Sequence, residues 1–393
     1  MSLPLIKMQN GQDRRLRAGH PWAFANELQL DAAARALAPG SLVTLAGADG
    51  RPLGTAGFNL HSLIAARLYD RQPDRKLDAS FFHQRLAAAL ALRDRLHARP
   101  HYRLVHAEGD NLPGFIVDRY GDVLTVQANT ASAEQLTPVL LAALTELLRP
   151  RAIVLRNDSS IRALEGLDEA VRLAQGELDG PVEVLEGDCR FPVDPLAGQK
   201  TGWFFDLAPA RQFMARLARG TNVLDLYCHT GAFAVQAAAA GATRVDGLDR
   251  SEAAIALAGQ AAEANGVGRT CQFRRAEVFA ALEQWPSQER YGCVIADPPS
   301  FVKSRKELAV GARGYRKLAR LVAPRVAPGG FLFIASCSHH MPVDQFAVEV
   351  AAGLATAGRT GRIIAAGGAG PDHPVHPQLP ESAYLKYQIL QLD

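Results

Sequence analysis

The chain has 393 residues, a length at which two or three domains are expected. Its composition, 48% hydrophobic and 21% charged, is that of an ordinary folded protein and excludes a disordered or low-complexity chain. The net charge of +3 permits a nucleic-acid partner without requiring one, because binding depends on where Lys and Arg cluster.

The cysteines and the N-terminal residues indicate in which cellular compartment the protein is expected. Five cysteines are scattered without a CxxC pair, which argues against a disulfide framework and for a reducing environment. Residues 1–15 lack the continuous apolar stretch of a signal peptide, and no apolar run approaches the ~18 residues that span a bilayer. We therefore expect a cytoplasmic protein.

Residues 1–72 are expected to form a small β domain. Short apolar runs alternate with Gly and Pro, and the Ala-Asp-Gly turn at 48–50 between two such runs indicates a hairpin. The basic segment RRLRAGH at 14–20 is either a solvated face or part of a nucleic-acid-binding surface.

Residues 73–187 are expected to hold a linking helix and a central α+β domain. Helical spacing within 71–100 predicts a helix, with Asp78 or Ser80 as its N-cap. Strands follow within 103–127, then an amphipathic helix over 133–150 that ends at its final proline, then a strand at 151–157.

Residues 188–393 are expected to form an α/β domain. Apolar strands alternate with helices from NVLDLY at 222–227 onward, which predicts a doubly wound, mostly parallel, Rossmann-like sheet. Ligands of such sheets bind beyond the carboxyl ends of the strands.

The first of these strands leads into VLDLYCHTGAF at 223–233, a candidate cofactor loop. Gly231 has no Cβ, so backbone N–H groups can approach a ligand closely. A dinucleotide would favour the several glycines of GxGxxG, which this loop lacks. Asp225 instead suits a cofactor with an ammonium group, such as S-adenosylmethionine.

Acidic residues also follow the next two strands. Asp249 is placed to accept hydrogen bonds from ribose hydroxyls, and Glu277 to reach the exocyclic amine of adenine. Each acid alone could be an ordinary helix N-cap. One acid at each of three successive strand ends favours a cofactor that carries a nucleoside.

The fourth and fifth strands end in groups suited to cytosine chemistry. Asp297 begins a rigid Asp-Pro-Pro loop, which also holds the carbonyl of Pro298, and Cys337 ends the fifth strand. Since C5 of cytosine is weakly nucleophilic, a thiolate must first add to C6 to make an enamine that attacks a sulfonium methyl. Cys337 would be the nucleophile, and Asp297 would bond N3 and stabilise the charge on the ring.

Two other interpretations of Cys337 remain. It could be a buried structural cysteine, which is the usual fate of a cysteine in a strand. It could also join the histidines of SCSHH and DHPVH in a zinc site, although the spacing matches no common pattern. Those histidines are His339, His340, His373 and His376.

Taken together, the segments resemble the bacterial 23S ribosomal RNA large-subunit cytosine-C5 methyltransferases of the class I fold. The catalytic-domain segments are GQKTGWFFD (198–206), LDLYCHTGAF (224–233), LDRS (248–251), DPPSF (297–301), SCS (336–338) and DHPVHPQLPESAYLK (372–386). LRAGHPWAFANEL at 16–28 is similar to the start of the family's PUA domain, and EGDNLPGFIVDRYGD at 108–122 to its central domain.

The resemblance implies S-adenosylmethionine as cofactor, large-subunit ribosomal RNA as substrate, 5-methylcytosine as product, and a homodimer. It implies a catalytic Cys337 and Asp297, no metal, and RNA contacts from the PUA and central domains. The implied cofactor-binding residues are Gln199, Thr201, Gly202, Asp206, Asp225, Tyr227, Gly231, Asp249, Glu277, Asp297 and Pro298.

The chain departs from the family pattern in two places and leaves one role open. Leu207 follows Asp206 where Gln or Met is common, and Glu277 stands where Asp is usual. The loop after the fourth strand has Ser300 and no second cysteine, so the group that removes the C5 proton is undetermined. The alternatives are a guanine-specific RNA methyltransferase of the same fold, or a noncatalytic RNA-binding or ribosome-assembly factor.

Overall fold

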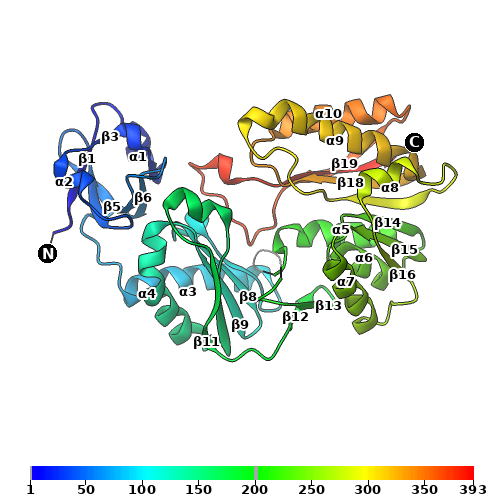
Figure 1. Ribbon diagram of the computed structural model, residues 1–393, viewed down its shortest axis with the longest axis horizontal. Helices are drawn as coiled ribbons and strands as arrows, with labels where there is room; N and C mark the ends of the chain where they lie inside the picture. Colours follow the sequence, from blue (N-terminus) through cyan, green and yellow to red (C-terminus); the bar gives the residue numbers. More distant parts are fainter. Residues whose placement is uncertain (1, 199–201) are drawn as a thin grey trace. The chain divides into compact units, whose positions relative to one another are not determined.

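The computed structural model describes residues 2–198 and 202–393, and the chain divides into two compact units. The first unit comprises the chain up to Val182, the described part of Val193–Phe205, and Pro371–Pro380. The second comprises Glu183–Pro192, Asp206–Gly370 and Glu381–Asp393. Figure 1 shows the elements of both.

The first unit begins with a six-stranded sheet in the order β2-β6-β5-β4-β1-β3. Its elements are β1 (Leu5–Met8), α1 (Arg14–Arg17), β2 (Trp22–Ala23), β3 (Leu28–Gln29), α2 (Ala32–Arg35), β4 (Leu42–Ala46), β5 (Pro52–Phe58) and β6 (Ala66–Asp70). The predicted hairpin is confirmed: β4 and β5 are antiparallel, and the backbone N–H of Gly50 donates to the carbonyl of Gly47 at 2.9 Å in the turn.

A second sheet of this unit has five strands in the order β11-β10-β9-β8-β7. Its elements are α3 (Ala79–Leu96), β7 (His101–His106), β8 (Phe115–Tyr120), β9 (Val123–Ala128), α4 (Ala131–Leu148), β10 (Ala152–Asn157) and β11 (Ala170–Gly176). Of the two predicted caps of α3, Asp78 is the one observed, since its carboxylate accepts from the N–H of Phe81. Helix α4 starts two residues earlier than predicted because Thr130 caps it.

The late segment Pro371–Pro380 belongs to the first unit. The fully buried guanidinium of Arg93 donates to Asp110 at 2.5 and 2.8 Å and to the carbonyl of Asp372 at 2.8 Å. The carboxylate of Asp372 accepts from the backbone N–H of Arg103, and its other oxygen bonds the ring of His373. These contacts give the DHPVH motif a structural role here.

The second unit is built on a seven-stranded sheet in the order β16-β15-β14-β17-β18-β20-β19. Strands β14 to β18 are mutually parallel, and β20 is antiparallel to both β18 and β19. The strands are β14 (Asn222–Leu226), β15 (Arg244–Asp249), β16 (Cys271–Arg275), β17 (Tyr291–Ala296), β18 (Val326–Ser336), β19 (Gly361–Gly367) and β20 (Lys386–Leu392). The prediction of a doubly wound, mostly parallel sheet is confirmed.

Six helices of the second unit connect or flank these strands. They are α5 (Ala208–Ala218), α6 (Ala232–Ala239), α7 (Glu252–Ala264), α8 (Val278–Glu283), α9 (Leu308–Val322) and α10 (Val343–Thr356). A two-stranded sheet, β12 (Val182–Glu186) with β13 (Cys189–Val193), lies where the chain passes between the units. Among the helices of residues 2–198 and 202–393, none has the length and apolar character needed to cross a membrane.

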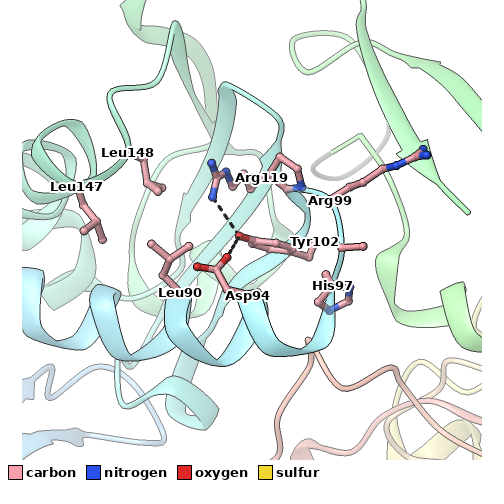
Figure 2. A pocket seen from close by; sticks show the side chains of 10 residues that line it. Leu90, Asp94, His97, Arg99, Tyr102, Arg119, Leu147 and Leu148 are labelled. Atoms are coloured by element: carbon pink, nitrogen blue, oxygen red, sulfur yellow. Dashed lines mark hydrogen bonds between the residues drawn. The ribbon is translucent and has the colours of Figure 1, made fainter.

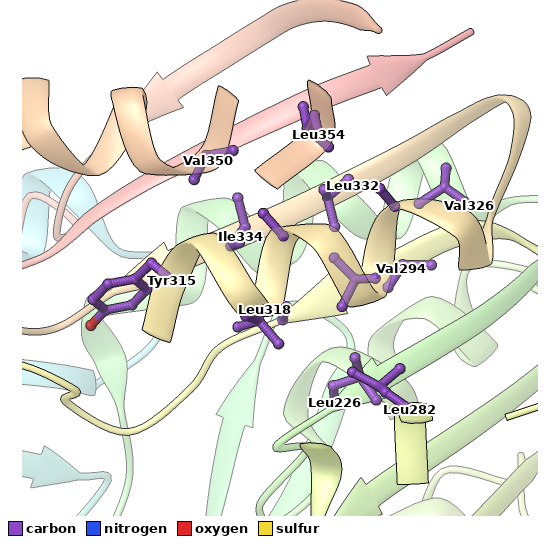
Figure 3. Packing of buried hydrophobic residues seen from close by; sticks show 14 of the residues in the cluster. Leu226, Leu282, Val294, Tyr315, Leu318, Val326, Leu332, Ile334, Val350 and Leu354 are labelled. Carbon is purple, nitrogen blue, oxygen red and sulfur yellow. The ribbon is translucent and has the colours of Figure 1, made fainter. Parts of the chain in front are cut away.

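The core of the second unit holds the site-bearing strands in place (Figure 3). Tyr315, Leu318 and Val322 share one face of α9 and are buried together with Leu332 and Ile334 of β18. Fully burying a side chain of this size stabilises a protein by about 1.5–3 kcal/mol. The carboxyl ends of β17 and β18 are thereby fixed relative to each other.

Candidate active site

The carboxyl ends of the parallel strands meet at one edge of the seven-stranded sheet. Leu226 of β14 is in register with Leu248 of β15 and with Ala296 of β17. Ala296 is in turn in register with Ile334 of β18. The chain therefore leaves each of these strands at the same edge, where parallel sheets bind their ligands.

The loop after β14 has an unusual backbone. Tyr227 and His229 adopt left-handed conformations with φ of +62° and +48°, although neither is glycine, and Gly231 has φ of +78°. Such conformations are costly for residues with a Cβ and cluster at functional sites. A Cβ on Gly231 would lie 3.1 Å from Ala258 and Phe273, so glycine here also makes room for protein side chains.

Asp225 is a buried acid beneath this loop. Its carboxylate accepts one hydrogen bond, 3.1 Å from the N–H of Ala234. Burial raises the pKa of Asp225 well above its usual range, and the charges of Asp297 and Asp249 raise it further, while Arg211 acts in the opposite direction. A cation bound beside Asp225 would relieve this penalty.

Asp249 follows β15 and supports the same loop. One carboxylate oxygen accepts from the N–H of His229 at 3.1 Å and the other from the N–H of Ser251 at 2.8 Å. A carboxylate offers about four acceptor positions, so lone pairs remain for two ribose hydroxyls. Both roles, as loop support and as ligand acceptor, are compatible.

Glu277 is exposed and caps α8, accepting from the N–H of Phe279 at 2.9 Å. The helix-cap alternative considered from the sequence is therefore present, and it leaves the second carboxylate oxygen for a ligand. Burial raises the pKa of Tyr227, and the nearby charges of Glu277 and Asp249 raise it further. The buried hydroxyl of Tyr227 has no hydrogen-bond partner in the described part of the chain.

Asp206 is buried at the start of the second unit's main segment. Its carboxylate accepts from the hydroxyl of Tyr384, and its other oxygen is buried without a partner among the described residues. Gly202, another predicted cofactor-binding residue, belongs to the first unit. Two further predicted residues, Gln199 and Thr201, lie outside the described residues.

The Asp-Pro-Pro loop and Cys337 are adjacent. The N–H of Asp297 donates to the carbonyl of Leu226 at 3.4 Å, which ties the loop to β14. The sulfur of Cys337 lies 4.0 Å from the carbonyl oxygen of Pro298. The predicted nucleophile and the predicted base-binding loop therefore stand side by side.

Cys337 differs from the other four cysteines, because it is half-buried and they are buried. Burial raises the pKa of Cys189 to about 11 and that of Cys271 and Cys293 to about 12. Burial also raises the pKa of Cys228, in the loop after β14, well above its usual range. Buried thiols of this kind are inert.

Comparison with known proteins identifies the family. Residues 125–359 match the S-adenosylmethionine-dependent methyltransferase family, and residues 6–71 match a PUA-like domain. The chain belongs to the S-adenosylmethionine-dependent methyltransferases. Proteins named "Ribosomal RNA large subunit methyltransferase I" are similar at 34% identity, one from Erwinia tasmaniensis over 98% of both chains and one from Alteromonas mediterranea over 100% of this chain and 99% of the relative.

Solved structures confirm the predicted fold. A protein assigned as a methyltransferase and crystallised with SAH has a TM-score of 0.83 at 22% identity, over 100% of both chains. A protein from Streptococcus mutans assigned as a SAM-dependent methyltransferase has a TM-score of 0.82 at 22% identity, over 99% of this chain and 100% of that one. The class I methyltransferase fold with an N-terminal PUA-like domain is thus established.

The residues of this methyltransferase fit S-adenosylmethionine. A buried acid with a raised pKa (Asp225) and an unpartnered buried oxygen (Asp206) both call for a cation such as the ammonium group. Asp249 and Glu277 keep acceptor positions for a ribose and an amine. The predicted strand-end acids are therefore chemically matched to the cofactor of the family.

The sequence did not single out Arg211 as part of the site of this methyltransferase. Arg211 of α5 is buried, donates to Glu186 at 2.5 and 2.7 Å, and lies over the ring of Phe233 at 5.8 Å. Its pKa is raised: burial lowers it, but Glu186, Asp206 and Asp297 outweigh that effect. Arg211 is therefore a fixed cation that offsets the charge of these acids. The one feature of the sequence that could have drawn attention to Arg211 is its position after the divergent Asp-Leu-Ala-Pro stretch.

The basic segment at 14–20 and a second basic segment at 303–317 differ in their surroundings. In the segment 14–20, Arg15 pairs with Glu27 at 2.8 Å and Arg17 with Asp13 at 2.7 Å, so most of that charge is neutralised locally. In the segment after the Asp-Pro-Pro loop, four cations are exposed and form no ion pair within the described residues. They are Lys303, Arg305, Lys306 and Arg313.

A cavity of about 520 Å³ lies in the first unit (Figure 2). Leu90, Leu147 and Leu148 line one part of it. Arg119 donates to the hydroxyl of Tyr102 at 3.0 Å, and that hydroxyl donates onward to Asp94. No predicted site residue lines this cavity.

The residues of the considered zinc site are divided between the two units. His373 and His376 belong to the first unit, and the ring of His373 lies 4.9 Å from that of His106. Cys337 and His339 belong to the second unit. Within the described ranges, no group of three or more His, Cys, Asp and Glu residues is arranged to hold a metal.

Proposed function

We propose that this methyltransferase forms 5-methylcytosine in large-subunit ribosomal RNA, with Cys337 as the covalent nucleophile. The observation that carries the proposal is the contact between the sulfur of Cys337 and the carbonyl of Pro298, 4.0 Å apart, at the strand edge that holds the cofactor acids. The names and full-length similarity of the relatives support ribosomal RNA as the substrate.

S-adenosylmethionine supplies an electrophilic methyl group when bound. Asp225 and Asp206 would face its ammonium group, Asp249 its ribose, and Glu277 its adenine. Gln199, Thr201 and Gly202 are proposed to complete the binding site on the strength of the family resemblance, together with Tyr227, Gly231 and Pro298.

The chain's own groups then carry the reaction. The thiolate of Cys337 forms a bond to C6 of cytosine, and the displaced electron pair makes C5 a nucleophile that takes the methyl group. Asp297, in its protonated form, donates a hydrogen bond to N3 and stabilises the negative charge that develops on the ring. A base removes the C5 proton, and the electrons of that bond expel the Cys337 thiolate and restore the aromatic ring.

The exposed basic segment supports an RNA substrate. Lys303, Arg305 and Lys306 follow the Asp-Pro-Pro loop directly and form no ion pair among the described residues. Cations that are not neutralised by the protein are available to phosphates. The PUA-like domain is proposed as a second RNA contact, because this domain type resembles the RNA-binding module of the family.

Replacement of Cys337 tests the proposal. Cys337→Ala should abolish methylation of ribosomal RNA taken from cells that lack this protein, while binding of S-adenosylmethionine stays close to wild type. A reaction at a guanine nitrogen needs no thiol, so methylation by Cys337→Ala would refute cytosine-C5 chemistry. Mass mapping of the methylated nucleotide identifies the base directly.

A covalent trap provides a second readout. RNA that contains 5-fluorocytosine should accumulate a stable adduct, because fluorine at C5 cannot be removed as a proton is. The adduct should be found on Cys337 by peptide mass analysis and should be absent in Cys337→Ala. A matched Cys293→Ala variant, which removes a buried thiol, should still form the adduct.

A further inference from the structure

Lys386 is a buried lysine at the start of β20. It lies in register with Ser336, the last residue of β18, and its side chain is 4% exposed. Its ammonium group donates to the carbonyl of Ser338 at 2.6 Å and to the carbonyl of Met341 at 2.8 Å. The two acceptors belong to the turn that follows Cys337.

A buried ammonium group is costly unless an opposite charge accompanies it. The two carbonyls use two of its three N–H donors, and Lys386 forms no ion pair with a carboxylate within residues 2–198 and 202–393. Burial lowers the pKa of Lys386 to about 8, while a charge on Cys337 acts to raise it. Two titrating groups affect each other equally, so a cation at Lys386 favours a thiolate at Cys337.

We propose that Lys386 is a positioning residue that keeps Cys337 ionised and holds the turn after it in place. The inference deepens the proposed function, because it assigns a source for the thiolate that attacks cytosine. It also explains why a buried lysine stands at the first position of β20.

The other titratable groups around Cys337 come from three directions. Asp297 follows β17, and its carboxyl group interacts electrostatically with the guanidinium of Arg211 of α5. Tyr315 of α9 contacts the serines on both sides of Cys337, and His339 continues the turn. Lys386 is the cation that bonds the turn itself.

Thiol titration of the full chain tests the proposal without RNA or cofactor. Alkylation of Cys337 by iodoacetamide, followed by site-specific mass analysis across pH, should give wild-type Cys337 a pKa below the ordinary thiol value of about 8.5. In Lys386→Met the midpoint should rise by about one unit, which slows alkylation at pH 7 roughly ten-fold. Lys386→Arg, which retains a cation, should recover most of the shift.

Internal controls separate electrostatics from unfolding. Gln388→Met removes another buried polar side chain from β20 and should leave the midpoint unchanged. The four buried cysteines should stay protected, and their alkylation would report a loss of fold. A wild-type Cys337 that titrates at or above the ordinary thiol value overturns the proposal, as does a folded Lys386→Met with a wild-type profile.

The outcomes also separate this inference from the proposed function. If Cys337→Ala still methylates RNA, the cytosine chemistry fails, although the thiol titration can stand. If Cys337→Ala is inactive but Lys386→Met leaves the titration unmoved, the role of Lys386 fails alone. If both proposals hold, the pH–rate profile of Lys386→Met should move upward with the thiol midpoint.

Discussion

The hydroxyl groups of Ser338 and Ser300 lie 2.9 Å apart, and this hydrogen bond joins the loop after β18 to the loop after β17. The oxygen of Ser338 also accepts from the N–H of Val302 at 3.2 Å and lies 2.8 Å from the hydroxyl of Tyr315. Tyr315 in turn accepts from Ser336 at 2.7 Å. A buried hydroxyl network therefore surrounds Cys337 and fixes it against the Asp-Pro-Pro loop.

Ser338→Ala should lower the turnover number more than it affects binding of S-adenosylmethionine. The substitution removes one hydroxyl with three partners and leaves buried groups unsatisfied, which costs about 1–3 kcal/mol of stability. Thermal unfolding and steady-state kinetics measure the two effects. Ser304→Ala is the matched control, because Ser304 lies in the loop after β17 that Ser338 contacts and its side chain caps no helix N–H. A wild-type turnover number in Ser338→Ala would contradict the positioning role.

The seven-stranded sheet and its strand-end acids could be predicted because their signals are local. Each strand is a short apolar run, and Asp225, Asp249 and Asp297 lie within or directly after such a run. Parallel strands carry their carboxyl ends to one edge, so the acids were expected to gather there. The register of β14 with β15 and β17 agrees with that expectation.

Contacts between residues far apart in the chain could not be predicted, because they produce no periodic pattern in the sequence. Arg93 bonds the carbonyl of Asp372, 279 residues later, and this contact includes the DHPVH motif in the first unit. Lys386 reads as an ordinary charged residue at a strand end, although the fold buries it. The network of Ser300, Ser336 and Ser338 depends on Tyr315 from a separate helix, which the sequence does not connect to the site.

Asp225→Asn should weaken binding of S-adenosylmethionine and stabilise the cofactor-free protein. The raised pKa of Asp225 means that the folded chain holds this proton more tightly than the unfolded chain. The contribution of this carboxyl group to the free energy of unfolding is therefore fully present below its ordinary pKa of 3.8. It declines as the pH rises toward the pKa of the folded chain. The gain in melting temperature of Asp225→Asn over wild type should be larger at pH 8 than at pH 5.

Calorimetry for cofactor affinity and thermal melts at both pH values check this prediction. Asp344→Asn, in the first turn of α10, removes an exposed carboxylate and should change neither quantity. An equal melting-temperature difference at the two pH values would show that Asp225 is not the titrating group.

Removal of the exposed cations Lys303, Arg305 and Lys306 should weaken RNA binding and leave cofactor affinity intact. If these side chains contact phosphates, the triple alanine variant loses counterion release at each contact. The slope of log K against log salt should become shallower by roughly 0.7 for each lost contact to single-stranded RNA. Filter binding across a salt series measures the slope.

A second triple variant separates a local contact from a general loss of charge. Arg219→Ala, Arg269→Ala and Arg362→Ala together remove three exposed cations elsewhere in the second unit. This variant should keep the wild-type slope. Equal slopes for the two triple variants would place the RNA contact elsewhere on the protein.

The first unit should lose stability as the pH falls below neutrality. Burial, together with the nearby charges of Arg103 and His373, lowers the pKa of His106 to about 2. The unfolded chain takes up a proton near the ordinary value of 6.5 that the folded chain refuses, so stability declines as the pH falls from 6.5 toward 2. His106→Gln should flatten this decline in urea titrations between pH 7 and pH 4. His61→Gln, which replaces an exposed histidine, should reproduce the wild-type slope, and an unchanged slope in His106→Gln would assign the proton uptake to another group.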